Sequence, residues 1–171
     1  VGICSVALLF TCHRLQINRI NSRIGQMAES TESNGNPHGA ARYWEIARRL
    51  NPINSEACQQ LARTLLKTSS AVHTKVRALE LYIEASRLDP HNLEAATRRT
   101  ELAVELKDFG QIAAGANAIL GHPEISSANN KQLRQFAVRC KANSMHDQRM
   151  ASTSSARHSW DLMAKTLENA I

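Results

Sequence analysis

Residues 40–52 read AARYWEIARRLNP, and residues 78–90 read ALELYIEASRLDP. Both stretches follow the pattern Ala-x3-aromatic-x2-Ala-x2-Leu-[Asn/Asp]-Pro, and Pro52 and Pro90 lie 38 residues apart. An internal period of this length is typical of helical solenoids, in which each repeat packs mainly against its neighbours. The pattern therefore predicts a chain of stacked helix pairs.

Each position of the pattern suits helix packing. The small residues and the aromatic residue share one helical face, because they are three or four positions apart. Small residues let a neighbouring helix approach, the aromatic ring fills the space beside them, and the Asn-Pro or Asp-Pro pair ends the helix. The predicted packing positions are Ala40, Trp44, Ala47, Pro52, Ala78, Tyr82, Ala85 and Pro90.

This pattern resembles the second helix of the tetratricopeptide repeat (TPR), whose first helix carries a large apolar residue, Leu, a small residue and an aromatic residue. The corresponding residues are Ile24, Met27, Ala28 and Thr31 in a first repeat that starts near Asn21, and Cys58, Leu61, Ala62 and Leu65 in the second. The period exceeds the 34 residues of the family by four. We expect residues 67–73 to absorb the excess in the turn between the two helices.

The remaining chain follows the pattern less closely. A third unit covers residues 91–123, with Ala116 at the aromatic position, and a fourth helix pair is expected at 128–142 and 156–171, separated by a polar stretch at 143–155. The resemblance implies an all-α, TPR-like α-solenoid of about three to four helix-turn-helix repeats. The predicted divisions are 1–20 for an apolar N-terminal helix, 21–123 for the repeats and 124–171 for a degenerate repeat or capping helices.

The N-terminal residues 1–12 read VGICSVALLFTC, an uncharged run that is followed by Arg14, Arg19 and Arg23. Twelve helical residues span about 18 Å, whereas a bilayer core of about 30 Å needs about 20 residues. Because the sequence starts at Val, we expect residues upstream and a single-pass membrane helix, with the repeats on the cytoplasmic side that arginines favour. A secretion signal and a packed first helix of a soluble protein are the alternatives.

The sequence contains few residues in patterns that carry chemistry. Its cysteines, at positions 4, 12, 58 and 140, show no Cys-x2-Cys spacing, and no phosphate-binding glycine loop or hydrolase motif is present. We therefore expect no catalytic residue, cofactor or metal, and a chain that is not an enzyme. The net charge is +6, but the basic residues form no run of five, which favours a solvated surface over nucleic-acid binding.

The family resemblance also implies a concave face lined by the first helix of each repeat. The outward positions of those helices give the predicted partner-binding residues Glu29, Glu32, Glu56, Gln59, Arg63, Glu94, Glu101 and Glu105. This set is mostly acidic, and it does not contain the combination of Lys, Arg and Asn side chains with which members of the family clamp a peptide carboxylate. It favours a basic or mixed partner.

Together these observations predict a non-catalytic scaffold for protein–protein interaction. We expect a membrane-anchored TPR subunit that stabilises or recruits other subunits of a membrane complex, without a small-molecule substrate. One alternative is a soluble or periplasmic TPR adaptor. The other is an RNA-binding helical repeat protein, whose binding would weaken steeply with salt.

Overall fold

The computed structural model describes residues 2–126 and 130–168. Within these residues all regular structure is helical, which confirms the prediction of an all-α chain. The elements are α1 (Gly2–Ser33), α2 (Pro37–Leu50), α3 (Ser55–Thr68), α4 (Val72–Leu88), α5 (Leu93–Leu106), α6 (Phe109–Leu120), the short 3-10 helix η1 (Pro123–Ser126) and α7 (Lys131–Glu168).

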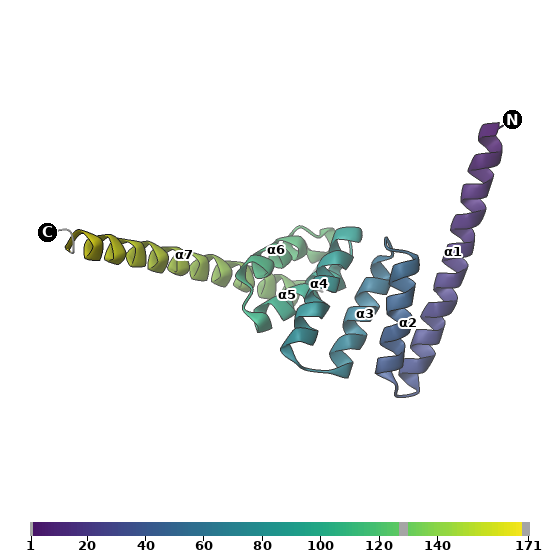
Figure 1. The fold of residues 1–171 in the computed structure, drawn as a ribbon, viewed down its shortest axis with the longest axis horizontal. Helices are drawn as coiled ribbons and strands as arrows, with labels where there is room; N and C mark the ends of the chain where they lie inside the picture. Colours follow the sequence, from purple (N-terminus) through teal and green to yellow (C-terminus); the bar gives the residue numbers. More distant parts are fainter. Residues whose placement is uncertain (1, 127–129, 169–171) are drawn as a thin grey trace. The chain divides into compact units, whose positions relative to one another are not determined.

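The chain divides into two compact units, residues 1–98 and residues 99–171. In the first unit, α1 packs against α2, α2 against α3, and α3 against α4, so that consecutive helices stand side by side (Figure 1). In the second unit, α6 packs against α7. The predicted divisions after residues 20 and 123 stay predictions.

The core of the first unit follows the repeated pattern. Its small and aromatic positions are at most 5% exposed, and these are Ala40, Trp44, Ala47, Ala78, Tyr82 and Ala85. As predicted, α2 and α4 end before proline: Asn51 and Asp89 are the C-caps, and their backbone N–H groups donate to the carbonyl oxygens four residues earlier. The helix ends are thus fixed by the sequence pattern itself.

The extra residues of the second repeat lengthen its helices and not its turn. The α1–α2 turn covers residues 34–36, with Gly35 at a φ of 78°, and the α3–α4 turn covers residues 69–71, so the two turns are equally long. In contrast, α4 has 17 residues and α2 has 14. The prediction that residues 67–73 form a longer turn is therefore wrong. The segment contains no Gly or Pro that would keep it out of a helix.

The fourth helix pair that the sequence predicts does not form. A single helix, α7, runs through residues 131–168, including the polar stretch 143–155. This whole stretch of 38 residues lacks Gly and Pro, so nothing in it interrupts helical hydrogen bonding. Residues 2–126 and 130–168 therefore form three helix pairs, which are followed in the sequence by η1 and one long helix.

The prediction of a single-pass membrane protein with cytoplasmic repeats is wrong. Among the described residues, no helix combines the length and the apolar character that a membrane crossing requires. Residues 2–12 of the apolar run lie in α1, which continues to Ser33, whereas Val1 lies outside the described residues. After the apolar run, α1 carries Arg14, Arg19 and Arg23, and charged residues in a lipid core are costly.

Candidate functional site

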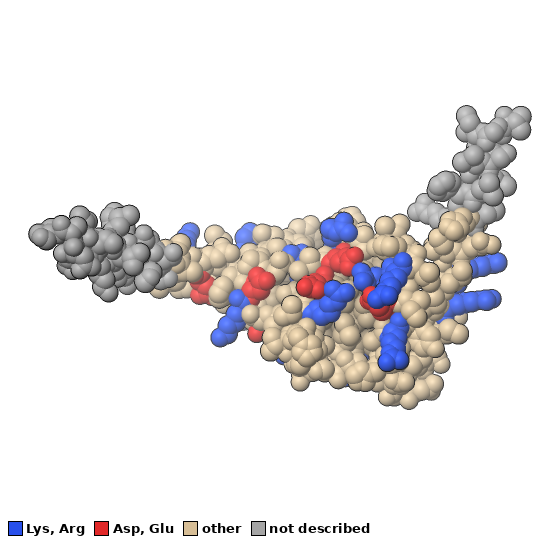
Figure 2. Space-filling view, viewed as in Figure 1, with Lys and Arg blue, Asp and Glu red and all other residues tan. Residues whose placement is uncertain are grey.

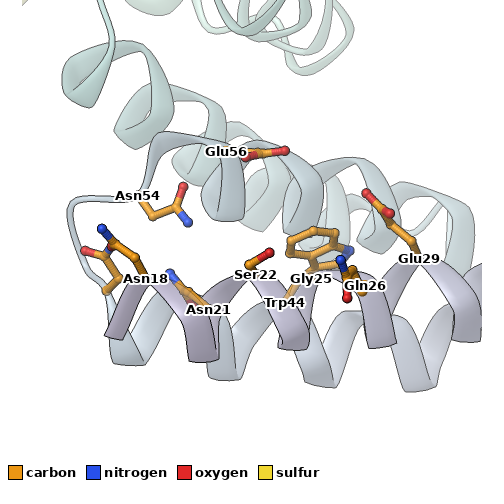
Figure 3. A pocket seen from close by; sticks show the side chains of 10 residues that line it. Asn18, Asn21, Ser22, Gly25, Gln26, Glu29, Trp44, Asn54 and Glu56 are labelled. Atoms are coloured by element: carbon orange, nitrogen blue, oxygen red, sulfur yellow. The ribbon is translucent and has the colours of Figure 1, made fainter. Parts of the chain in front are cut away.

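A pocket of about 330 Å³ opens in the first unit between α1, the α2–α3 loop and the start of α3 (Figure 3). Its lining is rich in carboxamide side chains, which are Asn18, Asn21, Gln26, Asn51 and Asn54. Two carboxylates and three further residues complete the lining, namely Glu29, Glu56, Ser22, Gly25 and Trp44. In Figure 3, Asn18 and Asn21 rise from α1 on the side of the pocket opposite Asn54.

Two of the lining residues carry buried polar atoms without a partner. Asn21 is only 7% exposed, and neither its Nδ2 nor its Oδ1 forms a hydrogen bond with any described residue. The same is true of the indole Nε1 of Trp44. Leaving a buried polar group unpaired costs about 1–3 kcal/mol, so native proteins rarely keep such groups without a reason. Asn21 offers both a donor and an acceptor beside the pocket.

Gly25 brings the Trp44 ring close to α1. A Cβ atom at position 25 would lie 3.3 Å from Trp44 Cη2 and 3.4 Å from Cζ3, which is tighter than most side-chain contacts. The absence of a side chain at this position therefore has two consequences. It lets the indole pack against α1, and it leaves open the space above the ring that a longer side chain would occupy.

The two carboxylates make the pocket negatively charged. Glu29 and Glu56 are exposed, and among the residues that the structure describes neither has an ion-pair partner. No Lys, Arg or His is among the lining residues described above. Figure 3 shows Glu29 on α1 and Glu56 on α3. An uncompensated pair of this kind attracts cationic groups.

The other residues that the sequence predicts for partner binding lie elsewhere. Glu32 accepts hydrogen bonds from Lys67 and from Thr64 Oγ1, and so links α1 to α3. Gln59 and Glu94 bind each other, with 2.8 Å between Nε2 and Oε2. Arg63 is exposed on α3, and Glu101 and Glu105 belong to the second unit. Of the predicted set, only Glu29 and Glu56 meet at the pocket, and the sequence reasoning missed Asn21, Trp44 and Asn54 as lining residues.

The variant Glu32→Gln should reduce stability in a pH-dependent manner. The hydrogen bond from Lys67 holds the pKa of Glu32 below its ordinary value, so the ionised form stabilises the folded state. This stabilisation is complete above the unfolded pKa of about 4.3 and is lost as the pH falls through the lower folded pKa. Because Lys67 is half exposed, we expect a loss of only about 0.5–1 kcal/mol at pH 7.

Urea denaturation of the wild type and Glu32→Gln at pH 7, 5 and 3 measures this effect. The difference in free energy of unfolding should shrink toward pH 3. The variant Glu29→Gln, which removes an unpaired carboxylate from the same helix, is the control and should show little change. A difference for Glu32→Gln that does not depend on pH would contradict the assignment.

The thiol of Cys58 is expected to react slowly because of its position in the fold. Its side chain is fully buried in α3, and burial, together with the nearby Glu84 carboxylate, raises the pKa of the thiol to about 11. At pH 8 this leaves on the order of a hundredfold less thiolate than an ordinary cysteine has. We expect iodoacetamide to modify Cys58 at least tenfold more slowly in the native chain than in urea, as measured by mass spectrometry of the peptide that contains it. Equal rates would show that the thiol is accessible.

Comparison with known proteins gives similarity in fold alone. No protein-family model and no curated protein matches the sequence. The fold is similar to the type III secretion chaperone SycD of Yersinia enterocolitica, solved with a peptide of the translocator YopD, with a TM-score of 0.55, 11% identity, and coverage of 74% of this chain and 93% of that chain.

Two further similar structures are TPR domains. One is the first TPR of Spaghetti (RPAP3) bound to an HSP90 peptide, with a TM-score of 0.55, 11% identity, and coverage of 71% of this chain and 95% of that chain. The other is the TPR2B domain of yeast Sti1 in a complex with pHsp70, with a TM-score of 0.55, 12% identity, and coverage of 74% and 97%. The chain thus has a TPR-like helical repeat fold, as the sequence predicts.

Proposed function

We propose that this chain is a non-catalytic adaptor that binds an extended segment of a partner protein in the pocket between α1 and α3. The observation that carries this proposal is the unpartnered carboxamide of Asn21 beside two unpaired carboxylates in one pocket. The similar structures support it, because SycD and the Spaghetti domain were each solved with a peptide of another protein.

The chemistry of the pocket suits a peptide. An extended peptide presents C=O and N–H groups in alternation, and a carboxamide such as that of Asn21 can donate to the first and accept from the second. Glu29 and Glu56 favour a segment that carries Lys or Arg. The same carboxylates would repel phosphate groups, which speaks against RNA in this pocket. On the face shown in Figure 2, basic and acidic side chains are intermixed and form no continuous basic stripe.

Selection from a random heptapeptide library displayed on phage tests the proposal. The chain of residues 1–171 is the bait, and we expect enrichment of peptides that contain Lys or Arg. The double variant Glu29→Lys/Glu56→Lys should lose those peptides, because both substitutions reverse the charge of exposed positions at the pocket.

The control carries the same change of charge outside the pocket. The double variant Glu80→Lys/Glu124→Lys alters exposed residues of α4 and η1 and should retain the enriched peptides. Failure to enrich any peptide, or equal loss in both double variants, would overturn the adaptor proposal. A circular dichroism spectrum of each variant establishes that its helices are intact.

A further inference from the structure

The junction between the second repeat and α5 contains a glutamine that is held at both ends. Gln59 Oε1 accepts a hydrogen bond from Asn92 Nδ2 at 2.6 Å, and Gln59 Nε2 donates to Glu94 Oε2 at 2.8 Å. The Oδ1 of Asn92 accepts from the backbone N–H of Ala95 at 2.9 Å. The carboxamide of Gln59 is thus satisfied as both acceptor and donor in a buried position.

The pocket stands at the matching junction one repeat earlier. Asn54 and Glu56 lie 38 residues before Asn92 and Glu94. Asn54 has the same role as Asn92, since its Oδ1 accepts from the backbone N–H of Ala57 at 3.2 Å and caps α3. Among the described residues, the Nδ2 of Asn54 and the carboxylate of Glu56 have no partner. The same donor and acceptor are therefore present, but no described side chain joins them by hydrogen bonds as Gln59 joins Asn92 and Glu94.

The residue that closes the second junction is missing from the first. In the first helices of the two repeats Ala62 corresponds to Ala28, and by the same offset Gln59 corresponds to Gly25. In the second helices, which follow the four extra residues, Tyr82 corresponds to Trp44. A Cβ at position 25 would lie only 3.3 Å from the Trp44 ring, so glycine suits the packing of the larger indole against α1. The first repeat thus has glycine and tryptophan where the second has glutamine and tyrosine. As a result, a pocket of about 330 Å³ lies where the carboxamide of a glutamine would otherwise be.

We propose that the pocket is an open copy of the Gln59 junction and receives a glutamine side chain from an extended segment of a partner protein. The incoming carboxamide oxygen accepts from Asn54 Nδ2, and its NH₂ group donates to Glu56, as Gln59 does with Asn92 and Glu94. This inference rests on the proposed function, which it deepens by naming the anchoring residue of the partner.

Charge and burial favour this occupant over close alternatives. A glutamate in its place would set its carboxylate against Glu56 and would be rejected, whereas an alanine would leave Asn54 and Glu56 unpaired. Asn21, whose carboxamide is buried beside the pocket without a partner, can bind the backbone on either side of the anchor. Glu29 favours a basic residue next to the glutamine.

Three fluorescein-labelled heptapeptides test the inference. The probes are GKAQAKG, GKAAAKG and GKAEAKG, acetylated and amidated at their ends, and each is titrated with the chain of residues 1–171 and followed by fluorescence anisotropy. We expect the glutamine peptide to bind roughly tenfold more tightly than the alanine peptide, and the glutamate peptide to bind no better than the alanine peptide. In NMR spectra, the indole N–H resonance of Trp44 should shift with the glutamine peptide.

Two variants separate the anchor from the rest of the pocket. Asn54→Asp keeps an oxygen that caps α3 but removes the Nδ2 donor, so the preference for glutamine should disappear. The matched control is Asn92→Asp at the closed junction, which should leave peptide binding unchanged. The double variant Gly25→Gln/Trp44→Tyr copies the Gln59 and Tyr82 pair into the first repeat and should abolish binding of the glutamine peptide.

The possible outcomes distinguish this inference from the proposed function. Tenfold selectivity that is lost in Asn54→Asp supports the glutamine anchor. Equal binding of the glutamine and alanine peptides would overturn it, while the phage selection could still establish a peptide adaptor. Absence of binding by all three peptides at millimolar concentration would also overturn the anchor. If Asn54→Asp fails to fold, the glutamine-to-alanine ratio in the wild type still decides the question.

Discussion

The variant Tyr82→Ala is expected to lower the free energy of unfolding of residues 1–98 by about 3–5 kcal/mol. The Tyr82 side chain is 2% exposed and is one of the largest fully buried side chains of the chain that the structure describes. It lies on α4 between Ala78 and Ala85, two small residues that are themselves fully buried. Removing the ring leaves a cavity that close-packed helices cannot fill without moving.

Urea denaturation followed by Trp44 fluorescence measures this loss. The experiment uses a Trp160→Phe background, so that Trp44 is the sole tryptophan and reports on the first unit. Tyr82→Phe keeps the ring and should cost about 1 kcal/mol. Tyr43→Ala, at a half-buried position of α2, should also cost roughly 1 kcal/mol. A loss below 1 kcal/mol for Tyr82→Ala would mean that the aromatic position does not hold the helices together.

The fold was largely predictable because the decisive signals are local. Asn51 and Asp89 end their helices through the proline that follows, and Gly35 supplies the positive φ of the first turn. These effects act within a few residues, so a single sequence reveals them.

The lengths of α4 and α7 were not predictable in the same way. Residues 67–73 and the polar stretch 143–155 suggest loops. Only 69–71 form a turn, because the residues on either side of it extend α3 and α4, and 143–155 lies inside α7; neither segment contains a Gly or Pro that would stop a helix.

The site was only partly predictable because it depends on a difference between repeats. A shared pattern identifies the outward positions of the first helices, and so places Glu29 and Glu56 on one face. It treats Gly25 and Gln59 as equivalent, and likewise Trp44 and Tyr82. The pocket exists because these pairs are not equivalent: one junction is filled by a side chain of the chain itself, and the other is not.

The N-terminal prediction failed because composition was considered over too short a stretch. The residues that follow the uncharged run continue the same helix, and they include Arg14, Arg19 and Arg23. Membrane insertion depends on the whole helical span and not on its most apolar part.

The second large effect concerns Gly115 in α6, where the variant Gly115→Ala should destabilise the second unit by about 1–3 kcal/mol. In an exposed helix interior the same change stabilises by about 1 kcal/mol, because alanine is the better helix former. Here Gly115 is buried, and its added Cβ would overlap Thr100 Oγ1 and lie 3.3 Å from Thr100 Cβ and 3.4 Å from Thr100 Cα. The steric cost should therefore outweigh the gain in helix propensity.

Gly110 provides a matched control in the same helix. A Cβ at position 110 would meet only Asp108 Oδ1, at an ordinary 3.5 Å, so Gly110→Ala should be neutral or stabilising.

Thermal unfolding followed by circular dichroism compares the two variants. If the clash with Thr100 is the cause, Gly115→Ala should cost less in a Thr100→Ala background than alone, giving a coupling of about 0.5–3 kcal/mol in the double-mutant cycle. Gly115→Ala as stable as Gly110→Ala would show that α5 and α6 do not approach each other at this point. Ala116, the neighbour of Gly115, stands where the other two repeats carry an aromatic ring and is itself small and fully buried.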